Sequence, residues 1–227
     1  KPSSDIVIVD FLLILFIIVR LNFINNEKLE FEMPYKSPLQ DTKFILENLL
    51  SPHKDLDTST IDAVLSEAGK LADNDLAPLN HFGDKNNPVL RQDNEVQTPE
   101  GFKTVFSKIA EGGWIGVASE GEYDGMDLPG RMSAAINEYW HGANMSFALC
   151  SLLTQGLIDA FTLVGTDEEK KTYLPKFNSG VWTGTMNLTE PQSGTDLATI
   201  KTKARFDGED WRIQGQKIYI TYGEHDM

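Results

Sequence analysis

Two stretches near the C-terminal end of the sequence hold the residues best suited to contact a ligand. The first, Met186–Asp196, reads MNLTEPQSGTD, and the second, Lys217–Gly223, reads KIYITYG. Thr189 offers a backbone N–H and a hydroxyl, and the nearby proline removes a ladder donor and frees the preceding backbone. Gly194 permits close approach to a phosphate, and Thr195 adds a hydroxyl. These groups could bind a flat polar ring that carries phosphates, although a β-hairpin with a TEPQSG turn accounts for the same residues without a ligand.

Three other kinds of site find little support. The one cysteine, Cys150, lies in an apolar run, which excludes a disulfide framework or a cysteine zinc site and predicts a buried thiol. The net charge of −14 argues against a nucleic-acid surface. A glycine-rich stretch at 112–130 has neither the P-loop nor the dinucleotide-binding spacing, and turns explain its glycines.

The elements that must position the two stretches begin with helices. From residue 33 to about 180 the apolar residues recur at three- and four-residue spacings, which predicts an α-helical domain over 33–180. A polar connector at 80–97 interrupts this pattern. The first expected helix is Asp41–Leu50, which ends at Ser51-Pro52, and the second begins at an N-cap of Thr58 or Ser59 and ends at Pro78. The third, Phe102–Ala110, follows a Thr98 N-cap. The last three are Met132–His141, the fully buried core helix Ala143–Val164, and a helix that begins at Gly165–Glu169.

After Gly180 the pattern changes to the alternation typical of strands. We expect strands at Val181–Met186, Thr199–Phe206, Trp211–Gln214 and Lys217–Thr221, with an Asp207-Gly208 turn. The sequence therefore predicts the α+β class, with a second domain over 181–227 that is incomplete, because apolar strands would otherwise lack partners.

Residues 1–32 differ in composition from the rest of the chain. Ile, Phe, Leu, Asn and Lys supply 20 of these 32 residues, and Gly, Ala, Thr and Gln do not occur. This bias favours translated non-coding DNA upstream of a start at Met33. An apolar run at 6–19 leaves a membrane anchor open as an alternative, although it is shorter than the roughly 20 residues needed to span a bilayer. A buried strand or helix is the third alternative.

Met186–Asp196 resembles the signature of the acyl-CoA dehydrogenases, with its T-E-P-x-(A/S)-G-(S/T)-D core. Tyr219–Gly223 is similar to the family's second stretch, an aromatic residue followed by I-(T/S)-x-(G/A). Glu120–Pro129 matches a further family run, although Asp124 stands where glycine is frequent. The connector and the region around Met33 resemble the long bacterial branch that contains the 3-methylmercaptopropionyl-CoA dehydrogenases of dimethylsulfoniopropionate breakdown.

The resemblance implies an all-α N-terminal domain, then the first strands of an antiparallel β-barrel, with a C-terminal helical domain missing from this chain. It also implies FAD as the cofactor. The residues that it places around FAD are Met186, Leu188 and Thr189 at the flavin, Gly194 and Thr195 beside the phosphates, and Tyr219, Ile220 and Thr221 on the other flavin face. Thr195 would also contact the entering acyl-CoA. Thr195 and Tyr219 replace the more frequent serine and tryptophan or phenylalanine but keep a hydroxyl and an aromatic ring.

The implied reaction is α,β-dehydrogenation of an acyl-CoA thioester, in which a carboxylate takes the α-proton and the β-hydrogen leaves as hydride to the flavin. The family's base lies in the missing domain, so no catalytic residue is assigned here. Glu190 belongs to the turn of the motif. Glu138 and His141 are expected to pack or to form hydrogen bonds.

Further expectations also follow from the resemblance. They are electron-transferring flavoprotein as the partner, a homo-oligomer for the full-length protein, a bacterial cytoplasmic location, and inactivity of this chain alone. An acyl-CoA oxidase remains an alternative, as does a truncated binding module with an N-terminal membrane anchor. A stop codon after Met227 would favour the module, and continued coding would favour the fragment. Acyl-chain length is not predicted.

Overall fold

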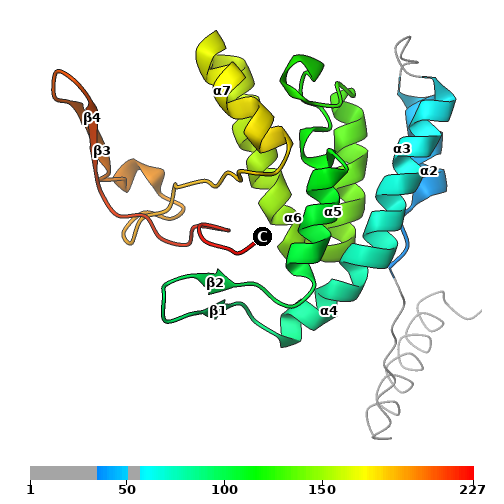
Figure 1. Ribbon diagram of the computed structural model, residues 1–227, viewed down its shortest axis with the longest axis horizontal. Coiled ribbons are helices and arrows are strands. Elements are labelled where there is room, and N and C mark those ends of the chain that lie inside the picture. Colours follow the sequence, from blue (N-terminus) through cyan, green and yellow to red (C-terminus); the bar gives the residue numbers. More distant parts are fainter. Residues whose placement is uncertain (1–34, 51–56) are drawn as a thin grey trace, which may run out of the picture. The chain divides into compact units, whose positions relative to one another are not determined.

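The computed structural model describes residues 35–50 and 57–227, which are helical over most of their length as far as Asn178 and then form short antiparallel strands (Figure 1). The predicted α+β class is confirmed. The predictions for residues 1–32, Met33 and Ser51-Pro52 lie outside the described residues, and the domain limits at 33–180 and 181–227 stay predictions. The helices are α2 (Leu39–Phe44), α3 (Thr58–Leu71), α4 (Ala77–Lys85), α5 (Phe102–Glu111), α6 (Gly130–Val164) and α7 (Asp167–Asn178), with π-helical turns η1 (Ile45–Leu49) and η2 (Ala72–Leu76).

The α3–α4 region differs from the prediction at both ends. The N-cap of α3 is Asp57, one residue before the expected Thr58, and its carboxylate accepts a hydrogen bond from the Thr60 N–H at 2.7 Å. Pro78 does not close the helix, because it lies in the first turn of α4, where a missing N–H costs no hydrogen bond. The helical path therefore continues through η2 to Lys85.

The connector is also more ordered than its polar composition suggests. Its first residues belong to α4, and β1 (Val89–Leu90) pairs antiparallel with β2 (Val96–Gln97). Thr98 does not cap α5. The N-cap is Gly101 at φ 91°, a left-handed conformation that glycine adopts without strain, and the helix begins at Phe102.

α6 forms the centre of the helical part and packs against α3, α4 and α7 (Figure 1). The two predicted helices Met132–His141 and Ala143–Val164 are its two halves, joined at a kink where Asn144 has φ −157° and ψ 88°. The side chains of Tyr139, Trp140 and Phe147 are fully buried there. The second half is not fully buried as predicted, since Leu163 is 83% exposed.

By length and composition, α6 is the one helix among the described residues that could cross a membrane. Its most apolar window has a mean hydropathy of 1.7, and 33% of that window is buried in the fold. Core helices of soluble proteins meet the same criterion, and Gln155 and Asp159 interrupt the apolar run. In this fold α6 packs against α3, α4 and α7.

The loop between α5 and α6 and the start of α7 confirm two sequence signals. The helix predicted to begin within Gly165–Glu169 is α7, and Thr166 and Glu169 form a capping box at its start. Asp124 adopts φ 64°, the left-handed conformation that explains why glycine is frequent at this place in the family signature. At Gly125 a Cβ atom would lie 2.0 Å from the Ser119 carbonyl oxygen, so only glycine fits.

The C-terminal part contains less regular β-structure than predicted. β3 (Lys203–Phe206) pairs antiparallel with β4 (Trp211–Gln214) across the Asp207-Gly208 turn, as expected. The segment before β3 includes a 3₁₀ turn, Leu197–Thr199, because Asp196 accepts a hydrogen bond from the Ala198 N–H.

Two predicted strands of this part do not form. Val181–Met186 and Lys217–Thr221 lie outside regular ladders. Positive φ angles of 56° at Tyr219 and 52° at Tyr222 break the extended conformation that a strand requires.

Candidate functional site

The two motif stretches lie side by side and run antiparallel. The Ile218 N–H donates to the Thr189 carbonyl at 3.0 Å, and the Thr185 hydroxyl donates to the Thr221 carbonyl at 2.6 Å. Between them, the Lys217 ammonium donates to the Leu188 carbonyl at 2.9 Å. The structure thus brings together residues that are about 30 positions apart in the sequence.

Glu190 holds the two stretches and the base of the β3–β4 hairpin around one buried carboxylate. Its side chain is 2% exposed and forms an ion pair with Lys217 at 2.9 Å. It also accepts hydrogen bonds from the backbone N–H groups of Lys201 at 2.8 Å and Thr202 at 3.0 Å. Hydrogen bonding from Thr202, from the Lys201 N–H and from Lys217 lowers the pKa of Glu190 far below its usual range. A carboxylate whose charged form is favoured by these partners is a structural anchor, in line with its assignment to the turn.

A tight turn after Glu190 presents the next two motif residues to solvent. Glu190 and Ser193 exchange backbone hydrogen bonds at 2.9 and 3.0 Å, and the buried Ser193 hydroxyl donates to the Asp196 carbonyl at 2.8 Å. Gly194 and Thr195 are exposed as a result. Apart from Gly194 and its two chain neighbours, no described residue has an atom within 4 Å of the position that a Cβ atom on Gly194 would take, so the backbone there is open to a ligand.

The apolar motif residues are also uncovered. Met186 is 62% exposed, Leu188 is 40% exposed, and the Tyr219 ring is 87% exposed. Met186 and Leu188 are both exposed although they lie only two positions apart. Ile220 is half-buried and Thr221 is exposed.

The unpaired backbone N–H groups of the first motif stretch fit a phosphorylated, flat cofactor such as FAD. Within the part of the chain that the structure describes, nothing accepts a hydrogen bond from the backbone N–H of Thr189, Gly194 or Thr195. Unpaired N–H groups beside an open glycine suit phosphate oxygens or ring heteroatoms, and the exposed apolar side chains suit an aromatic ring. The residues present therefore fit the cofactor that the resemblance implies.

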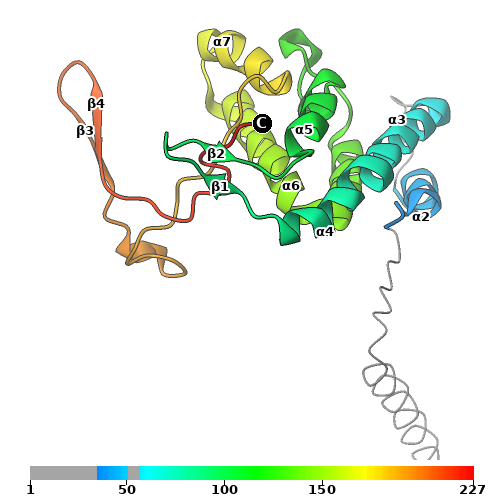
Figure 2. The ribbon, with the colours of Figure 1, turned by 60° about the horizontal axis from the view of Figure 1, so that its bottom comes forward.

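The second stretch is tied to the helical part by contacts that the sequence analysis missed. The Tyr222 hydroxyl donates to the Ser146 carbonyl on α6 at 2.7 Å, and burial raises the Tyr222 pKa. The Asp226 carboxylate accepts from the N–H and the hydroxyl of Thr98 at 2.9 and 2.6 Å. The C-terminal end accordingly lies near α5 and α6 (Figure 1, Figure 2).

These contacts border a pocket of about 350 Å³ beside Thr221, lined also by Phe102 and Leu149. No local pattern predicts such contacts, since the bond between Thr98 and Asp226 spans 128 residues.

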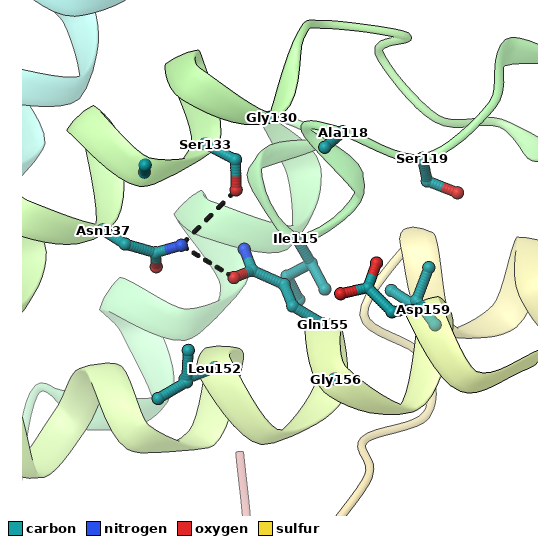
Figure 3. Close-up of a pocket in the computed structure, with 12 residues that line it drawn as sticks. Ile115, Ala118, Ser119, Gly130, Ser133, Asn137, Leu152, Gln155, Gly156 and Asp159 are labelled. Carbon is teal, nitrogen blue, oxygen red and sulfur yellow. Dashed lines mark hydrogen bonds between the residues drawn. The ribbon is translucent and has the colours of Figure 1, made fainter. Parts of the chain in front are cut away.

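A second pocket, of about 380 Å³, lies between the two halves of α6 (Figure 3). Asn137 from the first half donates to Gln155 of the second half at 3.0 Å, and Asp159 also lines the pocket. No residue of either motif stretch lines it.

Of the remaining candidates, His141 and Cys150 have structural roles, whereas Glu138 neither packs in the core nor forms a hydrogen bond among the described residues, contrary to the expectation. His141 lies 2.7 Å from the Asn137 carbonyl through Nδ1, and Glu138 is exposed. Cys150 is fully buried as predicted, and burial raises its pKa to about 12, which leaves an unreactive thiol. The described residues hold no group of three or more His, Cys, Asp or Glu side chains that could bind a metal ion.

Comparison with known sequences places most of the helical part in one family. Residues 59–181 match the family described as acyl-CoA dehydrogenase, N-terminal domain. The chain is 39% identical over 204 residues to 3-methylmercaptopropionyl-CoA dehydrogenase of Ruegeria pomeroyi, a match that covers 86% of this chain and 34% of that protein. It is 32% identical over 201 residues to the broad-specificity linear acyl-CoA dehydrogenase FadE5 of Mycobacterium tuberculosis, covering 84% of this chain and 32% of that protein. The chain thus spans about a third of the length of these relatives.

Solved structures agree with these sequence matches. An acyl-CoA dehydrogenase from Bacillus anthracis, complexed with FAD, superposes with a TM-score of 0.60 and 26% identity over 75% of this chain and 28% of that chain. Butyryl-CoA dehydrogenase from Megasphaera elsdenii, at 23% identity, gives a TM-score of 0.58 over 76% of this chain and 43% of that chain, which shows a common fold.

Proposed function

Because the chain belongs to the acyl-CoA dehydrogenase family, we propose that its two motif stretches form one side of an FAD site in an enzyme that dehydrogenates an acyl-CoA thioester at its α,β bond. The observation that carries this proposal is the antiparallel contact between the stretches, fastened by the ion pair of Glu190 with Lys217. The chain supplies part of such an enzyme, since it spans about a third of its relatives' length.

Each motif residue has a role that fits its place. Thr189 and Thr221 would offer their hydroxyls to the edge of the flavin, and the exposed side chains of Met186 and Leu188 would cover its ring. The open backbone at Gly194 and the Thr195 hydroxyl would hold phosphates, and Thr195 would also contact acyl-CoA. Tyr219 and Ile220 would close the second flavin face. When bound, FAD supplies hydride acceptance, a chemistry that these side chains lack.

The same geometry assigns no catalytic base among residues 35–50 and 57–227. The one deeply buried carboxylate at the motifs, Glu190, is held ionised by Thr202, Lys201 and Lys217, and its lowered pKa makes it a poor proton acceptor. We infer that the base belongs to a part of the enzyme beyond these 227 residues.

The proposed substrate is 3-methylmercaptopropionyl-CoA or a similar short acyl-CoA. The support is the 39% identity to the Ruegeria pomeroyi enzyme, which exceeds the 32% identity to the broad-specificity enzyme. An acyl-CoA oxidase is the second candidate, since the motifs do not determine access of oxygen. Electron-transferring flavoprotein as electron acceptor, a homo-oligomer and a bacterial cytoplasmic location complete the proposal.

The test uses the enzyme of full family length that contains this chain. Purified with bound FAD, it is mixed anaerobically with 3-methylmercaptopropionyl-CoA, butyryl-CoA or a long linear acyl-CoA, and the visible flavin absorbance is followed. We expect bleaching by at least one of the three, fastest with 3-methylmercaptopropionyl-CoA. If none bleaches the flavin, the dehydrogenase proposal is wrong. Rapid reoxidation by oxygen with formation of peroxide would favour the oxidase.

A further inference from the structure

The β3–β4 hairpin carries a basic face in a strongly acidic chain. Lys201, Lys203 and Arg205 alternate along β3 and the segment before it, so their side chains project from the same face. Arg212 on β4 is the cross-strand partner of Arg205. These four cations form the basic face, although the whole chain has a net charge of −14.

The cations of the basic face are only partly neutralised. Arg212 forms ion pairs with Asp207 at 2.6 Å and Asp210 at 3.7 Å. Among the described residues, no carboxylate forms an ion pair with Lys201, Lys203 or Arg205.

Arg205 lies directly opposite Arg212, and like charges in such cross-strand positions repel, although Asp207 and Asp210 offset the charge of Arg212. The basic face also lines a hollow of about 350 Å³, together with Gln214 and Gly215.

The basic face begins at the proposed cofactor site. The backbone N–H groups of Lys201 and Thr202 both donate to the Glu190 carboxylate, which fixes the start of the hairpin against the motif turn. The same turn presents Gly194 and Thr195 to solvent. A ligand that reaches the turn can therefore extend its charged end along the hairpin.

We propose that the basic face binds the phosphorylated adenosine end of acyl-CoA. This inference rests on the proposed function and deepens it by naming where the chain holds the nucleotide part of the substrate. The nucleotide of coenzyme A carries a 3′-phosphate in addition to its diphosphate, and several lysine and arginine side chains suit such a polyanion. The diphosphate of FAD shares part of this chemistry, and the experiment separates the two sources.

The experiment titrates the 227-residue chain with adenosine 3′,5′-bisphosphate or with ADP by calorimetry at low salt. The first ligand has the 3′-phosphate of coenzyme A, and the second has only a diphosphate. We expect the bisphosphate to bind more tightly than ADP. The double variant K203Q/R205Q should weaken its binding about tenfold or more, because charge-assisted hydrogen bonds to phosphate are lost.

The matched control is K170Q/K171Q on α7, which removes the same charge far along the chain from the hairpin. It should bind the bisphosphate as the unmodified chain does. If both variants weaken the binding of the bisphosphate equally, the effect comes from net charge alone and the proposal is overturned. The absence of measurable bisphosphate binding to the unmodified chain would also overturn it. Equal or tighter binding of ADP would assign the face to a diphosphate and overturn the coenzyme A assignment.

In the full-length enzyme, K203Q/R205Q should raise the KM for acyl-CoA while kcat stays the same. If acyl-CoA still reduces the flavin of this variant and the KM is unchanged, the inference is refuted. The proposed function would remain intact.

Discussion

At the residue scale, Glu190 connects three segments that are distant in sequence. Its carboxylate meets Lys217 from the second motif and the N–H groups of Lys201 and Thr202 at the start of the hairpin, while Gln192 donates to it at 2.5 Å from the turn. Because the group is almost fully buried, loss of its charge leaves Lys217 without its counterion and the N–H groups with a weaker acceptor. Glu190 therefore determines how the motifs lie against each other.

Replacement of Glu190 by glutamine should lower the melting temperature, and the loss should depend on pH. The pKa of Glu190 in the folded chain lies below its ordinary value of 4.5. Its stabilisation is thus fully present above about pH 4.5 and is lost as pH falls towards the folded pKa. Thermal melts of both proteins should differ most near neutral pH and converge in acid. E209Q, on the exposed hairpin turn, should melt like the unmodified chain throughout. A pH-independent difference would contradict this prediction.

At the element scale, Asn144 determines the course of α6. Its non-helical backbone separates the two halves, and its side-chain oxygen accepts from the Phe147 N–H at 3.1 Å, as an N-cap of the second half does. Its amide also donates to the Leu76 carbonyl at the end of η2 at 3.2 Å. The kink therefore has an identifiable cause in hydrogen bonding, and it places Asn137 opposite Gln155.

The Asn144→Ala substitution should destabilise the fold by about 1–3 kcal/mol, because it removes a cap and leaves a buried carbonyl without its donor. Urea unfolding followed by circular dichroism measures this loss. Asn144→Ser keeps an acceptor for the Phe147 N–H and should lose less. Equal losses in both variants would show that the cap contributes little to the kink.

At the scale of the whole molecule, the proposed FAD site is open on the side where Met186 and Tyr219 are exposed. Since the chain spans about a third of its relatives' length, much of the surface that would enclose the cofactor lies outside these residues. Little apolar area of FAD would be buried against this chain, and the free energy of binding should be correspondingly small.

We therefore expect the 227-residue chain alone to bind FAD weakly and to turn over no acyl-CoA. Fluorescence titration of FAD and an anaerobic acyl-CoA assay measure these two properties, with the full-length enzyme as the positive control. Measurable turnover by the chain alone would contradict the expectation, and it would place a catalytic base within these residues.

The sequence by itself determined the helical character of the first part, the start of α7, the β3–β4 hairpin and the two motif stretches. Each of these depends on residues a few positions apart. The three- and four-residue spacing of apolar side chains and the pairing of Thr166 with Glu169 act locally, so they are visible without a fold. The family resemblance rested on runs of the same local kind and was confirmed by the match over residues 59–181.

Only the tertiary structure decided how these parts meet. The bond between Thr98 and Asp226, the ion pair between Glu190 and Lys217, and the Tyr222 contact with Ser146 join residues far apart in the chain. Their partners depend on packing that no local pattern records. The strands predicted at 181–186 and 217–221 do not form, and Tyr219 has a positive φ angle within the second of them. The motifs were recognisable as sequence, but their antiparallel contact belongs to the folded chain, where direct hydrogen bonds between the stretches and the buried Glu190 carboxylate hold them together.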